Sequence, residues 1–185
     1  MRRLRTTGAL LTVAMAATAA LMVTPAAGAD EVLAHWIQNA SRLRCLQPVD
    51  GSHEQGAAIV QMPCDESESE IQNRNSVQFW MPERVGDFTR YKNVKTGLCL
   101  DARGGAANHT PIQQWPCNEI SNEKWDRPAS DRRTIRSRVS GSTSHCLDVP
   151  GGSLMDIGLA MQLYRCSTDN QAQFWDTRVP NFPIE

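Results

Sequence analysis

The sequence has little of what a catalytic or metal-binding protein requires. It contains no Cys-x-x-Cys pair and no Gly-x-Ser-x-Gly, and its four histidines are scattered along the chain. The spacing of a zinc site and the pattern of an activated nucleophile are therefore both missing. We expect no enzymatic activity, no metal and no other cofactor.

Positive charge is also scarce. Outside the first 29 residues, 16 basic residues stand against 20 acidic ones, without any polybasic stretch. Proteins that bind nucleic acid or anionic lipid concentrate Lys and Arg, so neither partner is expected. No apolar segment after residue 29 approaches the roughly 20 residues that cross a bilayer, so no membrane insertion is expected either.

The one long apolar run lies at the start of the chain. Three arginines among the first five residues precede an apolar stretch over residues 9–23, and small residues follow up to Ala29. This pattern is typical of a secretory signal peptide, here residues 1–29, cleaved before Asp30. A membrane span is the competing interpretation, but the run is short and diluted by Thr and Ala. We predict export, and hence a secreted, extracellular chain of residues 30–185.

Cysteine is present in a repeated phrase. A Cys-Leu, a second Cys 18 to 20 residues later and a closing Trp occur in three copies, over about residues 36–82, 88–127 and 134–178. An internal repeat outranks any local motif as evidence for architecture. In an oxidising compartment an even cysteine count indicates disulfides, and each copy carries its own pair. The predicted bonds are Cys45–Cys64, Cys99–Cys117 and Cys146–Cys166.

The chain between the cysteines is expected to form strands. Short β-rich runs such as residues 88–94 and 134–139 alternate with turn residues, and after residue 29 no helical period holds convincingly beyond three turns. The fold class is therefore all-β. Three copies in one domain of residues 30–185 suggest three-fold pseudo-symmetry. The repeated Trp80, Trp125 and Trp175 are expected in the core, each with its indole N–H bonded to an acceptor.

Together these elements resemble a known family. Cys-Leu-Asp, a glycine-containing turn, Gln-Leu-aromatic-x-Cys and Gln-x-Trp, in this order, are similar to the ricin B-chain type lectins and to the trefoil carbohydrate-binding modules of secreted bacterial glycosidases. The resemblance spans about residues 36–178. It implies a β-trefoil fold with up to one shallow sugar site per repeat.

The resemblance also implies which residues contact a sugar. In this family an aromatic ring two residues before the second Cys stacks on the sugar, and the Asp after Cys-Leu, a Gln and an Asn-Gln pair bond its hydroxyls. The second repeat matches with Asp101, Gln113, Trp115 and Asn122, while Glu123 replaces the usual Gln. The third repeat matches with Asp148, Gln162, Tyr164 and Gln173. Ala172 stands where the Asn is expected, and Asn170 is a candidate to reach in from the loop.

The first repeat lacks these groups. Gln47, Val60, Met62 and Val77 occupy the four positions, so we predict no sugar site of the family's kind there. Its longer loop carries an acidic run over residues 65–70. A solvated loop is the simplest interpretation, and a calcium site is the alternative because carboxylates suit hard cations.

We predict a secreted, non-catalytic carbohydrate-binding protein with one or two weak sites for galactose- or xylan-type saccharides or glycosylated surfaces. The alternative is a protein-interaction scaffold, such as a toxin delivery subunit or a protease-inhibitor-like trefoil. A separate secreted enzyme or toxin chain is a further possible partner. Glycoside hydrolysis by the carboxyl groups of Asp101 and Glu123 is a third interpretation, but the same residues serve as hydroxyl acceptors in a lectin.

Overall fold

The computed structural model describes residues 34–67, 76–118, 120–128, 133–141 and 144–178 of the 185-residue chain. The predicted signal peptide and residues 68–70 of the acidic run lie outside the described residues. The chain divides into two units, residues 1–31 and 32–185, and all described residues belong to the second.

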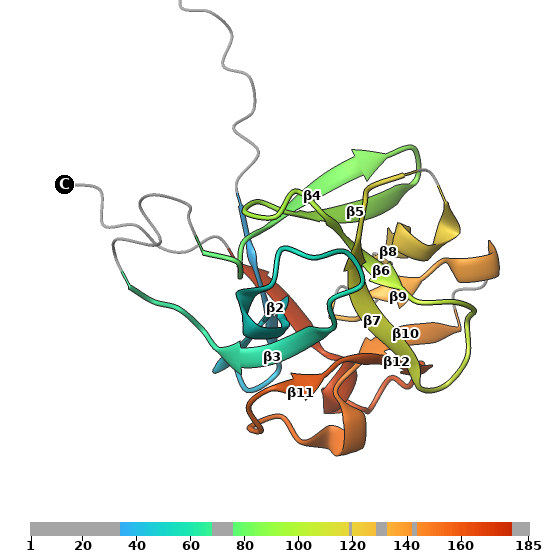
Figure 1. The fold of residues 1–185 in the computed structure, drawn as a ribbon. Helices are drawn as coiled ribbons and strands as arrows, with labels where there is room; N and C mark the ends of the chain where they lie inside the picture. The colour runs from blue at the N-terminus through green and yellow to red at the C-terminus, as the bar shows by residue number, and fades with distance from the viewer. Residues whose placement is uncertain (1–33, 68–75, 119, 129–132, 142–143, 179–185) are drawn as a thin grey trace, which may run out of the picture. The chain divides into compact units, whose positions relative to one another are not determined.

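The described residues form thirteen strands and five short 3-10 helices, which confirms the all-β prediction (Figure 1). In the first repeat the strands are β1 Trp36–Asn39, β2 Arg44–Pro48, β3 Ile59–Pro63 and β4 Trp80–Val85. In the second they are β5 Phe88–Asn93, β6 Cys99–Ala102, β7 Thr110–Trp115 and β8 Trp125–Asp126. In the third they are β9 Arg136–Ser137, β10 His145–Asp148, β11 Leu159–Ala160, β12 Gln162–Arg165 and β13 Trp175–Arg178. The helices are η1 Val49–Gly51, η2 Ser121–Glu123, η3 Val139–Gly141, η4 Pro150–Gly152 and η5 Gln171–Gln173.

The strands pair antiparallel in two sheets that tie the repeats together. One sheet has the order β11-β3-β2-β1-β13, so the third repeat borders the first on both sides. The other has the order β4-β5-β6-β7-β12-β10-β9-β8, and β5 also pairs with β8. Within the second unit, the first strand β1 lies beside the last strand β13 (Figure 1).

The central hairpin has the same register in every repeat. Cys45 lies opposite Met62, Cys99 opposite Trp115 and Cys146 opposite Tyr164. Two residues further along, the pairs are Gln47 and Val60, Asp101 and Gln113, and Asp148 and Gln162. Directly opposed residues project to the same face of an antiparallel pair. The register therefore brings the predicted Asp and Gln together beside the aromatic ring.

The repeated tryptophans lie in the core, as predicted. Trp80, Trp125 and Trp175 are almost fully buried in one hydrophobic cluster. Their indole N–H groups donate to the backbone carbonyls of Leu46, Leu100 and Leu147 at 3.0, 3.0 and 2.9 Å. Each bond fixes the Trp against the Cys-Leu strand of its own repeat, so these rings are structural.

All three predicted disulfides are present. They are Cys45–Cys64, Cys99–Cys117 and Cys146–Cys166. Each one closes the central hairpin of its repeat, which carries the candidate site residues. No helix among the described residues is both long and apolar enough to span a lipid bilayer.

Candidate binding sites in the second and third repeats

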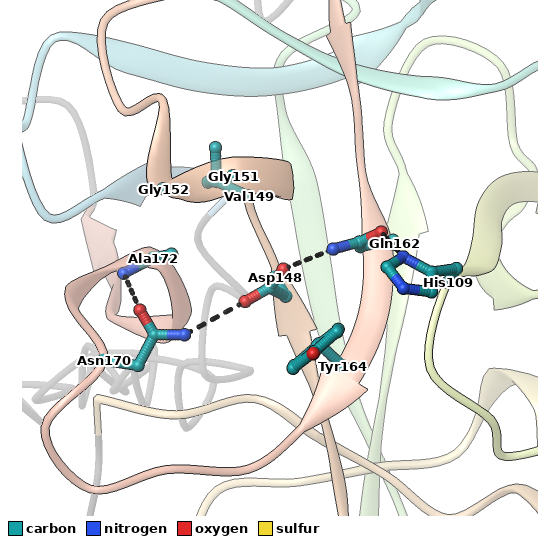
Figure 2. A pocket seen from close by; sticks show the side chains of 9 residues that line it. All are labelled: His109, Asp148, Val149, Gly151, Gly152, Gln162, Tyr164, Asn170 and Ala172. Carbon is teal, nitrogen blue, oxygen red and sulfur yellow. Dashed lines mark hydrogen bonds between the residues drawn. The ribbon is translucent and has the colours of Figure 1, made fainter.

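A cavity of about 420 Å³ opens at the third repeat, between β10, β12 and the η4 and η5 segments (Figure 2). Its walls include the predicted residues Asp148, Gln162 and Tyr164, and also Asn170. The hairpin register explains why the first three converge, since Asp148 lies opposite Gln162. The structure thus brings together most of the residues predicted for this repeat.

Asp148 is the fixed polar centre of this cavity. Its Oδ1 accepts a hydrogen bond from Gln162 Nε2 at 2.7 Å, and its Oδ2 accepts from Gln173 Nε2 at 3.2 Å and Asn170 Nδ2 at 3.3 Å. Burial raises the pKa of the Asp148 carboxyl, against the opposing effects of these amides and of His109. A carboxylate accepts up to about four hydrogen bonds, so Asp148 retains capacity for a ligand hydroxyl.

Tyr164 supplies an exposed aromatic surface beside this carboxylate (Figure 2). The residue is 37% exposed, whereas the other tyrosine of the chain, Tyr91, is almost fully buried. The ring is therefore available to stack on the apolar face of a ligand, as a sugar site requires.

Gln173 lies behind the carboxylate rather than on the cavity wall. It is fully buried, its Nε2 also donates to the carbonyl of Arg165 at 3.0 Å, and its Oε1 accepts from the N–H of Ser167 at 2.8 Å. Gln173 thus orients Asp148, whereas its predicted contact with a ligand stays a prediction.

Asn170 reaches into the third site, as the sequence suggested. Its Nδ2 donates to Asp148, while its Oδ1 caps η5 by accepting the N–H of Ala172 at 3.1 Å. Asn170 thereby supplies an amide where Ala172 lacks one.

The second repeat contains the same Asp–Gln pair. Gln113 Nε2 donates to Asp101 Oδ1 at 2.8 Å, and burial raises the pKa of the Asp101 carboxyl. Trp115 is half-buried at the end of β7, outside the hydrophobic core cluster. Asn122 is also half-buried, and its Nδ2 donates to the carbonyl of Gly104 at 3.4 Å. The ring and the amide thus lie at the surface beside a buried carboxylate.

Glu123 has a carboxylate oxygen where the equivalent Gln78 and Gln173 of the other repeats have an amide nitrogen. Its Oε1 accepts the backbone N–H of Asn118, whereas its Oε2 is buried without a partner among the described residues. Gln78 and Gln173 use the equivalent amide nitrogen as a donor. Burial raises the pKa of the Glu123 carboxyl and nearby Asp101 raises it further, while the Asn118 N–H and Arg90 oppose the rise. Like Gln173, this buried side chain has a supporting position.

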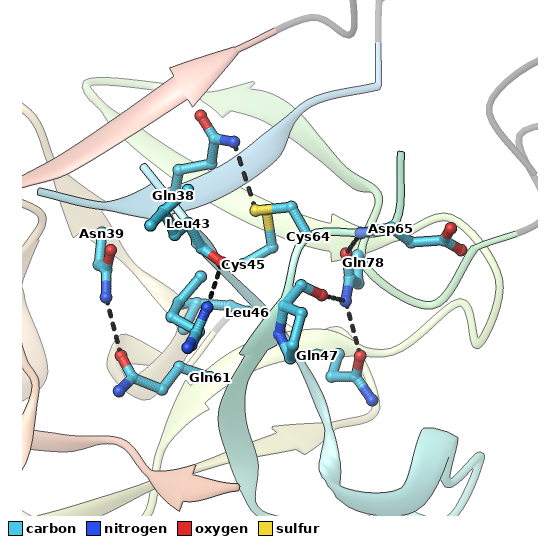
Figure 3. Close-up of a disulfide and its surroundings, with 12 residues drawn as sticks. Gln38, Asn39, Leu43, Cys45, Leu46, Gln47, Gln61, Cys64, Asp65 and Gln78 are labelled. Atoms are coloured by element: carbon cyan, nitrogen blue, oxygen red, sulfur yellow. Dashed lines mark hydrogen bonds between the residues drawn. A yellow bond between two sulfur atoms is a disulfide. The ribbon is translucent and has the colours of Figure 1, made fainter. Parts of the chain in front are cut away.

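The first repeat keeps this support without a carboxylate at the Asp position (Figure 3). Gln78 Nε2 donates to Gln47 Oε1 at 2.8 Å and to the carbonyl of Pro63 at 2.9 Å, and its Oε1 accepts from the N–H of Asp65 at 2.7 Å. The hydrogen bonds that hold the fold therefore persist where the predicted ligand groups are absent.

His109 is the residue of this site that the sequence pattern did not indicate. It lines the third-repeat cavity, although it belongs to the second repeat, between β6 and β7 (Figure 2). The repeated motif assigns each site only residues of its own repeat. It therefore gives no signal for a residue that the preceding repeat contributes.

One close group of possible metal ligands occurs in the described part of the chain, formed by Cys99, Cys117 and Glu123. The two sulfur atoms are bonded to each other. Disulfide sulfurs are not thiolates, which are the form of Cys that binds metals, so this group offers a metal only the Glu123 carboxyl.

Comparison with known proteins agrees with the fold and the repeats. The family model described as the ricin-type beta-trefoil lectin domain matches residues 34–175. Nigrin b of Sambucus nigra is 34% identical over 82 residues, which are 44% of this chain and 13% of that protein. The chain thus matches only a small part of the length of this relative.

Solved structures give the same architecture. The designed three-fold symmetric protein ThreeFoil aligns with a TM-score of 0.65 at 18% identity, over 78% of this chain and 96% of that one. A ricin B-like lectin of Macrolepiota procera, solved in complex with lactose, aligns with a TM-score of 0.61 at 18% identity, over 80% and 96%. These likenesses confirm the predicted β-trefoil.

Proposed function

Since this chain belongs to the family of ricin-type β-trefoil lectin domains, we propose that it is a secreted, non-catalytic carbohydrate-binding protein with sites in its second and third repeats. The observation that carries this proposal is the third-repeat cavity. There, a carboxylate held by three amide groups lies beside an exposed aromatic ring.

In the third site, the Tyr164 ring stacks on the apolar C–H face of a saccharide, and Asp148 accepts hydrogen bonds from its hydroxyls. The amides of Gln162, Gln173 and Asn170 hold the carboxylate in place before the ligand arrives. Such preorganisation reduces the conformational entropy lost on binding.

In the second site, Trp115 and Asp101 have the corresponding roles, and Gln113 orients the carboxylate. Asn122, whose Nδ2 donates to the carbonyl of Gly104, is proposed as a further amide for the ligand. The first repeat is proposed not to bind in this manner, because Gln47 and Met62 occupy the positions of the carboxylate and the ring.

The proposed ligands are galactose- or xylan-type saccharides, free or on glycosylated surfaces. The lactose complex of the similar Macrolepiota procera lectin supports a galactose-type ligand. One ring and a few hydroxyl bonds suit an affinity of about 1 mM per site, or about −4.1 kcal/mol. Two sites on one domain could raise the avidity for a polymer by roughly 10² where both engage.

Secretion is proposed from the N-terminal sequence pattern, which predicts cleavage before Asp30. A separate secreted enzyme or toxin chain is a further possible partner, since a module that binds without catalysis can direct another protein to a glycan. The acidic run of the first repeat leaves a protein-interaction scaffold as the second candidate function.

The test is a glycan and polysaccharide binding screen on residues 30–185, with the double variant Trp115→Ala, Tyr164→Ala beside the wild type. We expect the wild type to bind a galactose- or xylan-type ligand, and the folded double variant to lose that binding. Equal binding by both proteins would reject the assigned sites. A wild type that binds no saccharide but captures a protein from culture supernatant would favour the scaffold function instead.

A further inference from the structure

In each repeat one residue with a positive φ donates its backbone N–H to a strand of another repeat, which is β7, β12 or β3. Gly56, His109 and Gly158 have φ angles of +82°, +67° and +75°. Their backbone N–H groups donate to the carbonyls of Gln114, Leu163 and Gln61 at 2.8, 2.8 and 2.9 Å. Gln114 and Leu163 each precede the aromatic residue of their strand, and Gln61 precedes the corresponding Met62. Gly56, His109 and Gly158 therefore occupy equivalent positions.

Glycine occupies two of these positions and histidine the third. A positive φ costs a residue with a Cβ about 1 kcal/mol or more, whereas glycine adopts it freely. The fold requires a positive φ at this position, but it does not require a residue with a Cβ, because glycine makes the same contact in the other two repeats. The strain at His109 therefore comes from the histidine side chain. Strained backbone residues cluster at ligand sites, where the strain serves to position a side chain.

The His109 side chain is directed at the third-repeat cavity (Figure 2). Its Nδ1 lies 2.9 Å from Gln162 Oε1, and its ring meets the Tyr164 ring nearly edge-on, with centroids 5.3 Å apart and planes at 71°. The His109 ring therefore forms a side wall of the cavity, steeply inclined to the Tyr164 ring on which a ligand would stack.

The hydrogen bonds determine which nitrogen of His109 carries the proton. Gln162 Nε2 donates to Asp148, so the atom that faces His109 is Oε1, which can only accept. Nδ1 must therefore be the protonated nitrogen. In the neutral ring Nε2 is then an acceptor, and no described residue donates to it.

We propose that His109 is a ligand-contacting and specificity-determining residue of the third site, supplied by the second repeat. It would limit the stacking surface and accept a hydrogen bond from a saccharide hydroxyl at Nε2. This inference rests on the proposed function of that site.

The second site offers a natural contrast. At Gly56 a Cβ would lie 3.6 Å from Trp115 Cζ3 and 3.9 Å from Gln113 Oε1, both ordinary contact distances. A Cβ would thus fit beside Trp115, at the cost of the strain of a positive φ, but glycine leaves that wall open. The two sites therefore differ at this wall, and we infer that their saccharide preferences differ as well.

A purely structural role for His109 makes a different prediction. Gln114 Nε2 donates to the carbonyls of Ser52 and Glu54, and so holds the loop from the preceding repeat. Leu163 occupies the equivalent position in the third repeat and cannot do so. If His109 only replaced that attachment, any side chain that bonds Gln162 would restore full binding.

The experiment uses Trp115→Ala as background, so that only the third site binds, and compares His109→Gly with His109→Asn. Asparagine tolerates the left-handed backbone and offers an amide donor to Gln162, but it has no ring. Lactose and xylotriose are titrated calorimetrically into each variant, and thermal unfolding is followed in parallel. The reciprocal variant Gly56→His, in a Tyr164→Ala background, adds the wall to the second site.

We expect both His109 variants to remain folded and to bind about three- to tenfold more weakly, the effect of one neutral hydrogen bond. The ratio of lactose to xylotriose affinity should change, and Gly56→His should shift that ratio at the second site in the opposite direction. Unchanged affinity and ratio in His109→Gly, or full affinity in His109→Asn, would overturn the inference while leaving the proposed function intact. If the Trp115→Ala background itself binds neither sugar, the third site fails, and the inference fails with it.

Discussion

At the scale of single residues, three buried carboxyl groups shape both candidate sites. Burial raises the pKa of Asp101, Glu123 and Asp148 above their ordinary values. Two of them have amide donors that favour the ionised form, whereas Glu123 Oε2 has none among the described residues. We therefore expect the raised pKa values of Asp101 and Asp148 to affect binding, and the unpartnered Glu123 oxygen to affect the stability of the fold.

The first prediction concerns the pH dependence of binding through Asp101 and Asp148. A hydroxyl donates to an ionised carboxylate, so affinity should fall as the pH drops from about 7 through the raised pKa values of these groups. Their effect on folding has the opposite sign. A carboxyl whose pKa is higher in the folded state stabilises the fold fully below its unfolded pKa and loses that contribution as the pH rises through the folded pKa.

Calorimetric titration between about pH 7 and pH 4, with circular dichroism at each pH, separates the two effects. The expected result is weaker saccharide binding at acid pH by a chain that is still folded. Constant affinity over this range would contradict a role for either carboxylate as hydroxyl acceptor.

The second prediction is that Glu123→Gln stabilises the protein. In the second repeat, Glu123 leaves a buried oxygen without a partner among the described residues. The amide of glutamine restores the donor that Gln78 and Gln173 provide in the other two repeats. Satisfying such a group is worth about 1 to 3 kcal/mol. Urea unfolding at neutral pH should show the gain, and the gain should shrink at acid pH, where Glu123 is protonated.

The matched control is Gln173→Glu, which creates the same mismatch in the third repeat and should destabilise it. Equal stability of Glu123→Gln and wild type at neutral pH would contradict this explanation, because the Glu123 oxygen would then carry no penalty in the folded protein.

At the scale of the elements, the central hairpin explains what the sequence could predict. The spacing of Asp148 and Tyr164 from the two cysteines is the same as in the second repeat, and β pairing turns that spacing into proximity. The disulfides and the buried tryptophans followed from the same repeat. A pattern that recurs within one chain is thus sufficient to predict contacts inside each repeat.

Contacts between repeats and the direction of side chains could not be predicted in this way. The motif gives Gln162 and Gln173 the same status, yet one lines the cavity and the other is buried behind Asp148. His109 enters the third site from the second repeat, and its equivalence to Gly56 and Gly158 is visible only in their positive φ angles and matching backbone hydrogen bonds. Both features depend on tertiary packing, which the spacing of a motif does not encode.

The third prediction concerns the disulfide of the β10–β12 hairpin. Replacing Cys146 and Cys166 by Ala removes the cross-link of a loop of about 20 residues and should lower stability by about 3 kcal/mol in the chain-entropy model. Because this hairpin carries both Asp148 and Tyr164, affinity at the third site should also fall.

Calorimetry with saccharide and urea unfolding measure the two effects separately. Replacing Cys45 and Cys64 by Ala is the control, since it should cost similar stability but leave third-site affinity unchanged in the folded protein. Equal loss of affinity in both variants would mean that the effect comes from general loosening rather than from the site hairpin.

At the scale of the whole molecule, three similar repeats share one scaffold and differ in their ligand groups. Gln78, Glu123 and Gln173 occupy one supporting position, and Trp80, Trp125 and Trp175 one core position. The first repeat keeps both positions while it lacks the carboxylate and the ring. Under the proposed function, the residues that contact the ligand are therefore different from the residues that hold the core together, so a repeat can lack a site and keep its structure.

The most direct test of this division is a nuclear magnetic resonance titration of residues 30–185 with the saccharide that binds best in the screen. We predict shift changes in two groups, one around Asp101 and Trp115 and one around Asp148, Tyr164 and His109, and none around Gln47 and Met62. Shift changes centred on the first repeat, with the other two unaffected, would contradict the proposed sites.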